Sequence, residues 1–238
     1  MRSRFIGIAM IHLGFAVAVQ AQNTVTTQQQ LWFRYNPRLI INDQWTVKAD
    51  IDERVFAFPF RQHQFVARTQ AEYTINPNWK VSAGGSFFQN ALPQNPFTDV
   101  EISVPELRPE FETNIKHNLG ENWKIQHRFR ADFRFPEIDN TFTYSHSRFR
   151  YMLQFKRQLS EHWTMTVWDE ILVNGLKEIP VNTFDQNRIG ANFTYNTAGP
   201  FAVDIMYFNW YQLRLLPNNY FNRHIVRLTL IHKIRVKQ

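Results

Sequence analysis

Apolar and polar side chains alternate along residues 123–135 strictly enough to indicate the secondary structure of this stretch. Apolar side chains occupy one parity and charged or amide side chains occupy the other, and His127 is the single polar residue on the apolar parity. Successive side chains of a β-strand point to opposite faces, whereas a helix would spread both sets around its surface. The stretch therefore predicts a strand with one apolar face and one densely charged face.

The same alternation recurs along most of the chain. It predicts strands at residues 30–40, 45–56, 62–75, 79–90, 104–117, 123–135, 144–157, 163–173, 184–195, 201–212 and 221–235. Soluble sheets average about five or six residues per strand, whereas crossing a bilayer at a tilt takes roughly 9–11. Strand length therefore favours a membrane barrel, which dilutes the hydropathy signal because only alternate residues face lipid.

The connections between these strands alternate in length. Short polar turns begin at residues 42, 76, 120, 160 and 196, and longer segments such as residues 89–103 and 174–183 lie between them. Outer-membrane barrels have this arrangement, with short turns in the periplasm and longer loops outside. Each short turn is followed by an aromatic residue, as an aromatic girdle at the membrane interface requires. The predicted girdle consists of Trp45, Trp79, Trp123, Trp163 and Phe201.

The predicted fold class is all-β, an antiparallel transmembrane β-barrel of 10–12 strands, with 12 favoured. Single-chain bacterial barrels have an even number of strands and both termini in the periplasm, and the eleven strands above leave one crossing unmatched. Residues 23–30 would supply an upward crossing and give 12; one falsely predicted strand would give 10. The alternative is a soluble β-sandwich or lipocalin-like barrel, which would turn the apolar faces inward.

The N-terminal segment has the pattern of an export signal. Arg2 and Arg4 precede an apolar stretch at residues 5–19, and small residues lead up to Ala21. We expect a signal peptide cleaved after Ala21, followed by a single barrel domain at residues 22–238; an uncleaved anchor helix is the alternative. The chain contains no cysteine, which excludes disulfides, thiolate metal sites and cysteine nucleophiles. Export without cysteine fits a Gram-negative envelope better than a disulfide-stapled secreted domain, and together with the barrel pattern it predicts location in the outer membrane.

Strand parity places many charged residues inside the predicted barrel. We expect these charges to pair with one another and fill the interior rather than leave an open channel, because a small barrel holds little water and burying an unpaired charge costs several kcal/mol. The removal of the signal peptide also lowers the net charge from +7 to +5, since it carries Arg2 and Arg4. The predicted lumenal charge network comprises Glu106, Arg108, Glu110, Glu112, Arg128, Arg130, Asp132, Arg134, Arg148, Arg150, Glu170 and Arg188.

Five segments together resemble a bacterial outer-membrane barrel family, domain-of-unknown-function family 2490. They lie at residues 127–135, 148–151, 169–174, 184–188 and 207–210, and the resemblance spans most of the chain after the first short turn. It implies an outer-membrane barrel with no assigned activity, and it supplies no catalytic residues.

One local constellation has catalytic residue types. The segment Ser145–His146–Ser147 lies at the outer end of the predicted strand 144–157. In a lipid hydrolase, Asp169 or Glu170 on the neighbouring strand would orient the histidine. Adjacent strand residues face opposite ways, so His146 and Ser147 do not simply meet. The chain has no phosphate-binding loop, His-Glu-x-x-His pair or calcium loop, so we expect no cofactor and no metal.

The remaining patterns allow a functional and a structural interpretation. One set, Glu170, Gln186 and Arg188, would form either a vestibule that binds a polar solute or an ion pair between two strands. The arginines at positions 128, 130, 134, 148 and 150 would either select anions or pair with the glutamates at positions 106, 110 and 112. Aromatic and arginine side chains are expected on opposite strand faces, which argues against nucleic acid as a partner. The main hypothesis is therefore a non-enzymatic structural or partner-binding barrel.

We expect this barrel to contact outer-membrane lipid and lipopolysaccharide, and a protein partner through its outer loops. Residues 89–103, with Pro93, Pro96 and Phe97, are the expected contact loop. The alternatives are an enzyme acting on lipid A or phospholipid, for which His146→Ala would abolish hydrolysis, and a narrow solute channel.

Overall fold

The computed structural model describes residues 23–99, 102–179, 181–216 and 218–236. The predicted signal peptide and its cleavage site lie outside the described residues. Within them, no helix has the length and apolar character needed to span a membrane. The strands are β1 (Thr24–Ile40), β2 (Trp45–Phe56), β3 (Arg61–Asn76), β4 (Trp79–Leu92), β5 (Ile102–Asn118), β6 (Trp123–Ile138), β7 (Thr141–Phe142), β8 (His146–Gln158), β9 (Trp163–Gly175), β10 (Phe184–Asn196), β11 (Phe201–Leu213) and β12 (Asn219–Arg235).

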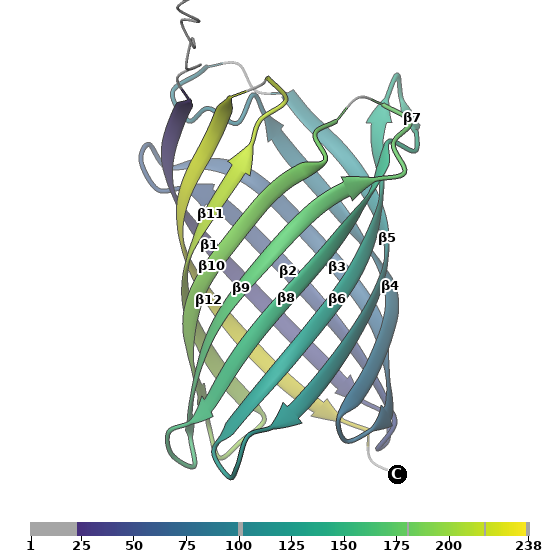
Figure 1. The fold of residues 1–238 in the computed structure, drawn as a ribbon, viewed down its shortest axis with the longest axis vertical. Coiled ribbons are helices and arrows are strands. Elements are labelled where there is room, and N and C mark those ends of the chain that lie inside the picture. Colours follow the sequence, from purple (N-terminus) through teal and green to yellow (C-terminus); the bar gives the residue numbers. More distant parts are fainter. Residues whose placement is uncertain (1–22, 100–101, 180, 217, 237–238) are drawn as a thin grey trace, which may run out of the picture.

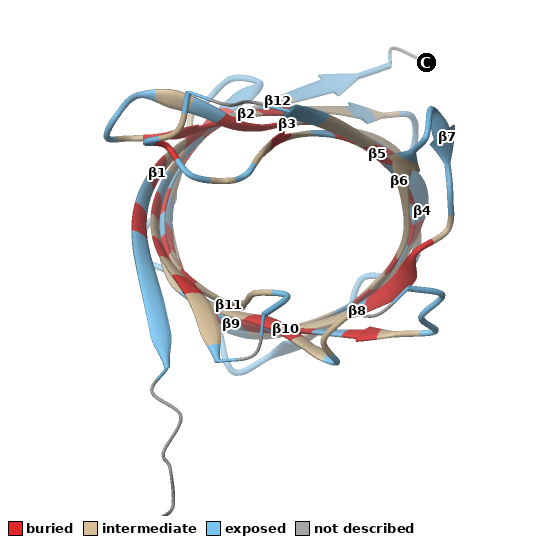
Figure 2. Cartoon of the chain, turned by 90° about the horizontal axis from the view of Figure 1, so that it is seen from above, coloured by how far each residue is buried: buried red, intermediate tan, exposed pale blue. Residues whose placement is uncertain are grey.

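Eleven of these twelve strands form a closed barrel (Figures 1 and 2). Neighbouring wall strands pair antiparallel, except that β1 and β12 close the ring in parallel. The twelfth strand, β7, has two residues and pairs with the end of β6 beyond the wall. The predicted all-β barrel is thus confirmed, with twelve strands of which eleven form the wall, and with one parallel pair in an otherwise antiparallel wall.

Residues 23–30 do not form the separate upward crossing that was predicted. β1 begins at Thr24 and continues in one direction to Ile40, with Thr24 beside Asn219 and Ile40 beside Arg235 on β12. The parallel pairing satisfies the backbone groups at the edge of β1, which would otherwise need another strand. An odd number of wall strands therefore places the start of β1 and the end of β12 at opposite ends of the barrel (Figure 1).

The connections follow the predicted alternation. Short turns at residues 41–44, 77–78, 119–122, 159–162 and 197–200 join strands at one end, which we call the turn end. At the other, the loop end, the connections between wall strands at residues 93–101, 139–145, 176–183 and 214–218 are longer, and residues 57–60 form a tight connection between β2 and β3. The start of β1 lies at the loop end (Figure 1).

The outer surface of the wall is apolar. Each wall strand carries at least one exposed large apolar or aromatic side chain, and the five predicted girdle residues are the first residues of β2, β4, β6, β9 and β11 at the turn end. Their exposed fractions are 38% to 44%. The wall therefore does not have the inward apolar faces that the alternative, a sandwich or lipocalin-like barrel, would require.

Several histidines on the outer surface form hydrogen bonds with a tyrosine on the adjacent strand. His127 Nδ1 lies 2.9 Å from the hydroxyl of Tyr151, which explains the one polar residue on the apolar face of β6. The same cross-strand pair recurs between His224 and Tyr207 at 2.8 Å. A hydrogen bond within the surface removes the cost of leaving a polar ring nitrogen unpaired in an apolar environment.

Candidate functional site: the lumen

A buried salt-bridge network fills much of the barrel interior. At its centre, Glu110 on β5 pairs with Arg68 on β3 at 2.9 Å and with Arg130 on β6. Arg130 also bonds Asp132, two residues further along β6, at 2.8 Å, and Arg150 on β8 reaches Asp132 at 3.5 Å. These charged groups are at most partly exposed, so their mutual pairing is what makes their burial tolerable.

Two further glutamates on β5 extend the network along the barrel axis. Glu106 accepts hydrogen bonds from Arg108 at 2.7 Å and from Arg134 on β6. Glu112 lies 3.8 Å from Arg128 and 3.7 Å from Arg130. β5 therefore supplies the carboxylates and β6 most of the guanidinium groups, as the alternation on these neighbouring strands indicates.

Glu170 on β9 is shared by three arginines. Its carboxylate lies 2.7 Å from Arg128, 2.8 Å from Arg150 and 3.8 Å from Arg188. Arg188 also donates to Gln186 at 2.8 Å, so Glu170, Gln186 and Arg188 form a polar contact between β9 and β10. Together with the 3.1 Å pair of Arg148 and Asp185, these contacts include all twelve residues of the predicted charge network.

The network also contains two arginines, Arg34 and Arg54, that the sequence pattern did not identify as lumenal. Arg34 on β1 pairs with Asp52 on β2, and Arg54 shares the same carboxylate at 2.8 Å. Strand β1 gave a weak alternation because its inward face mixes charged residues with the buried Trp32. A mixed lumenal face removes the contrast between apolar and charged parities on which the prediction depended.

Aromatic side chains share the lumen with the arginines. Trp32, Trp168, Phe208 and Trp210 are all buried and line the internal cavity. The guanidinium carbon of Arg54 lies 3.8 Å from the ring centroid of Trp32, in cation–π geometry. The expectation that aromatics and arginines occupy opposite faces was therefore wrong for β1, where Trp32 and Arg34 both line the cavity, although it holds for β6. Inward aromatic side chains also occur on β9 and β11.

A cavity of about 560 Å³ lies inside the barrel. Of the charged residues that line it, fifteen are basic and four are acidic. The cavity surface thus carries an excess of positive charge, because several carboxylates that pair with the lining arginines, such as Glu106 and Glu110, are buried behind it. The added cations, such as Arg227 and Lys233 on β12, lie on strands whose inward faces also carry apolar residues.

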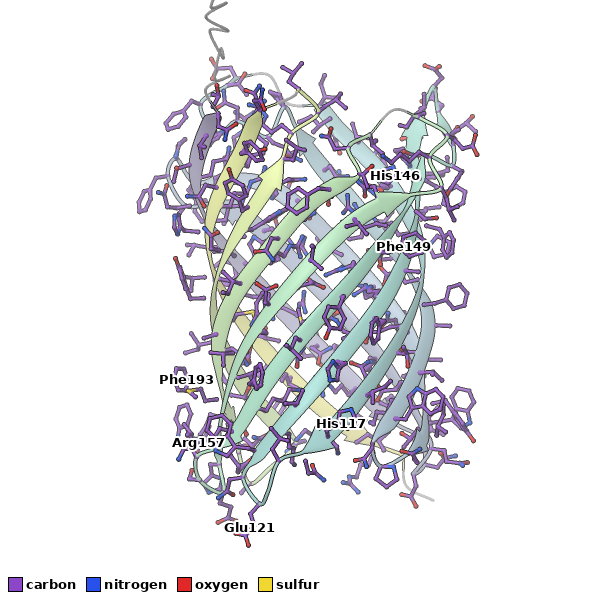
Figure 3. The ribbon with its side chains drawn as sticks, in the orientation of Figure 1. His117, Glu121, His146, Phe149, Arg157 and Phe193 are labelled. Atoms are coloured by element: carbon purple, nitrogen blue, oxygen red, sulfur yellow. The ribbon has the colours of Figure 1, made fainter. Side chains whose placement is uncertain are left out.

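The Ser145–His146–Ser147 segment lies at the loop end, opposite the turn that carries Glu121 (Figure 3). His146 Nδ1 lies 2.7 Å from Ser145 Oγ, and the ring's Nε2 lies 3.2 Å from Nη1 of Arg134. Ser147 points elsewhere and bonds the Tyr144 hydroxyl at 2.9 Å. A guanidinium group only donates, so Nε2 must accept and Nδ1 must carry the proton toward Ser145.

Neither expected carboxylate orients His146. Asp169 faces outward and bonds Asn187 at 3.0 Å, while Glu170 is held by the arginines inside the barrel. A serine nucleophile needs a histidine nitrogen that accepts its proton and an acidic group behind that histidine. The observed arrangement has the opposite polarity, because Arg134, a hydrogen-bond donor, contacts His146 in place of an accepting carboxylate. Across the described ranges, no cluster of three or more His, Asp or Glu residues is placed to hold a metal ion.

Comparison with known proteins identifies one family. The family described as "Protein of unknown function (DUF2490)" matches residues 29–237, which covers the barrel from the first part of β1 to the end of β12. No curated protein and no solved structure shows significant similarity to the chain.

Proposed function

The chain belongs to the DUF2490 family of proteins of unknown function, and we propose that it is an integral outer-membrane β-barrel with a structural or partner-binding role and no enzymatic activity. The observation that carries this proposal is the orientation of the wall, with apolar side chains outside on every wall strand and the ion pairs inside. In water such a surface would aggregate, whereas lipid solvates it.

The girdle residues support the same location. Five aromatic side chains stand in a row of strand starts at the turn end, where amphipathic rings prefer the headgroup region. The short turns then face the periplasm and the longer loops face outward, in contact with lipopolysaccharide. The closed wall also leaves no unpaired strand edge, which a bilayer would not tolerate.

Membrane fractionation tests the location. Cells producing the full chain are lysed, inner and outer membranes are separated by density, and the outer fraction is washed with alkaline carbonate. We expect the protein to remain in the outer-membrane pellet and to migrate faster on gels before boiling than after it, as a folded barrel does. Release into the soluble fraction without detergent would contradict the proposal.

The loop end offers the expected partner surface. Phe97 in the β4–β5 loop is 81% exposed, Phe58 is 78% exposed and Leu215 is 73% exposed. Exposed apolar side chains grouped at one end of a protein mark interaction surfaces. We assign a protein partner or lipopolysaccharide to this end, and alanine replacement of Phe97 together with Phe58 is the variant that tests it in crosslinking.

A narrow solute channel is the second candidate, because the cavity is lined by residues from both ends of the barrel. Gln94 lines it at the loop end and Lys233 at the turn end. Planar-bilayer recording with purified protein decides between the two: resolved conductance steps favour the channel, and a silent bilayer excludes it.

A further inference from the structure

An aromatic wall lines one side of the lumen, across from the network of β5 and β6. The rings of Trp32 and Phe208 lie 5.2 Å apart, those of Trp32 and Trp210 lie 6.0 Å apart, and those of Trp168 and Phe208 lie 5.5 Å apart. Gly190, between the strands that carry Trp168 and Phe208, leaves the space these rings fill, since a Cβ there would lie 2.5 Å from Phe208 Cβ. The wall is therefore continuous from β9 to β1.

The ion-pair network turns mostly cations toward the cavity, which fifteen basic and four acidic residues line. The carboxylates Asp52, Glu106, Glu110 and Asp132 are at most 1% exposed and do not line the cavity, whereas their arginine partners do. One carboxylate often serves several arginines, as Glu170 serves three. Each such shared carboxylate leaves positive charge uncompensated at the cavity surface.

Arg227 on β12 is the clearest surplus cation. Its register partners are Met206 on β11 and Trp32 on β1, so its side chain starts within the aromatic wall. Within the described residues it makes no ion pair within 4 Å, and its Nε is buried without a hydrogen-bond partner. A guanidinium group placed in this way favours a negatively charged ligand group, because it has five donors and no acceptor.

Buried donors in the same region also lack acceptors. The indole N–H groups of Trp168 and Trp210 and the Nε of Arg54 have no hydrogen-bond partner, although all three side chains are at most 7% exposed and line the cavity. Indole nitrogen and guanidinium nitrogen only donate. Because nearly all buried polar groups in proteins are paired, these donors call for an acceptor-rich occupant.

The loop end of the cavity is covered by the β4–β5 loop. The side-chain oxygen of Gln94 accepts from Arg223 at 2.7 Å, and its backbone carbonyl accepts from Gln28 at 2.8 Å. Arg223 is fully buried and stacks on Trp210 at 4.5 Å. The loop is therefore tied across the barrel mouth to β1 and β12, next to the aromatic wall.

We propose that the lumen binds a small organic anion with a planar aromatic body. The aromatic wall receives the ring system, while Arg227 and the unpaired indole N–H groups receive the carboxylate, sulfonate or phosphate group. The cavity of about 560 Å³ lies within the roughly 300–1,000 Å³ of small-molecule sites. This inference goes beyond the proposed function, because it assigns a ligand to the lumen and depends only on the folded barrel, whether that barrel is in detergent or in a membrane.

Isothermal titration calorimetry on the purified, detergent-folded full chain tests the proposal with three probes. Naphthalene-2-sulfonate carries both the ring and the charge, naphthalene-2-sulfonamide carries the ring alone, and inorganic sulfate carries the charge alone. We expect saturable binding of the sulfonate, after subtraction of a detergent blank, and binding of the other two that is weaker by ~10-fold or more. Equal affinity for sulfonate and sulfonamide, equal affinity for sulfate, or no saturable binding would each overturn the proposal.

Matched variants locate the site. Arg227→Gln removes the surplus lumenal cation and is expected to weaken sulfonate binding by ~10-fold or more. Arg157→Gln removes one cation beside Trp123 at the turn end, outside the lumen, and should leave the affinity unchanged. Trp210→Phe keeps the ring and loses the indole N–H, so it provides a second test if Arg227→Gln does not fold. Equal affinities of the two arginine variants, or full affinity of Trp210→Phe where Arg227→Gln is not folded, would contradict the assigned site.

Discussion

Arg134 donates to Nε2 of His146 at 3.2 Å, and this contact fixes the proton of the ring on Nδ1, where it points at Ser145 Oγ 2.7 Å away. A histidine that donates to serine does not remove the serine proton. Because Arg134 occupies the position behind the histidine that a triad carboxylate would occupy, the arrangement favours a structural role for these residues at the loop end. Buried hydrogen bonds of this kind stabilise the segment that joins β7 to β8.

We expect purified protein to hydrolyse phospholipid and lipid A no faster than its His146→Ala variant does. The measurement is release of fatty acid from mixed micelles containing either substrate. Turnover by the wild type that both His146→Ala and Ser145→Ala abolish, with the barrel still folded, would identify an enzyme instead.

Glu170→Gln is expected to destabilise the barrel by about 3–5 kcal/mol, because it removes one buried charge and leaves three guanidinium groups without their shared partner. Urea unfolding of the protein in lipid vesicles, followed by tryptophan fluorescence, measures the change. Asp169→Asn is the control: this neighbouring carboxylate faces outward and bonds only Asn187 among the described residues. An equal effect of the two substitutions would count against the network.

Gly190→Ala is expected to destabilise the barrel by about 1–3 kcal/mol through overpacking. The added Cβ would lie 2.5 Å from Phe208 Cβ, 2.6 Å from the Tyr207 carbonyl oxygen and 2.9 Å from Trp168 Cζ2. In Gly85→Ala the nearest atom would be 3.6 Å away, so that control should unfold like the wild type in the same urea series. Wild-type stability of Gly190→Ala would show that the aromatic wall is loosely packed.

Epitope tags test the odd number of wall strands. A tag inserted before Thr24 should bind antibody on intact cells, because β1 starts at the loop end. A tag inserted after Val236 should bind only after permeabilisation of the outer membrane, because β12 ends at the turn end. Two tags that become accessible together would indicate an even number of crossings.

Strand alternation predicts most of the wall, since the outer surface and the lumen carry opposite kinds of side chain wherever the lumen is charged. It predicts β6 and β8 within three residues of their observed bounds. It does not join residues 24–29 to β1 and offers them only as part of a separate crossing, because they are mostly polar on both parities and carry no contrast between faces. Parallel pairing with β12, a long-range contact with no local signal, makes that segment a strand.

The charge network is predictable and the aromatic wall is not. Inward glutamates and arginines on β5 and β6 follow directly from parity. On β11 the inward face contains Met206, Phe208 and Trp210 beside Asp204, so both faces of this strand are largely apolar and the alternation marks the lumenal face only weakly. Only the closed barrel shows which face of that strand encloses the cavity.

Spin labels at single introduced cysteines test the orientation of the wall most directly, and the absence of native cysteine makes the labelling specific. Phe149 and Phe193 project outward from the wall at 41% and 46% exposure, and Glu121 lies on a short turn (Figure 3). In lipid vesicles, labels at Phe149→Cys and Phe193→Cys should collide with oxygen and be shielded from a water-soluble nickel complex, while the label at Glu121→Cys should show the reverse. Equal access of the nickel complex to all three labels would contradict a membrane-embedded barrel.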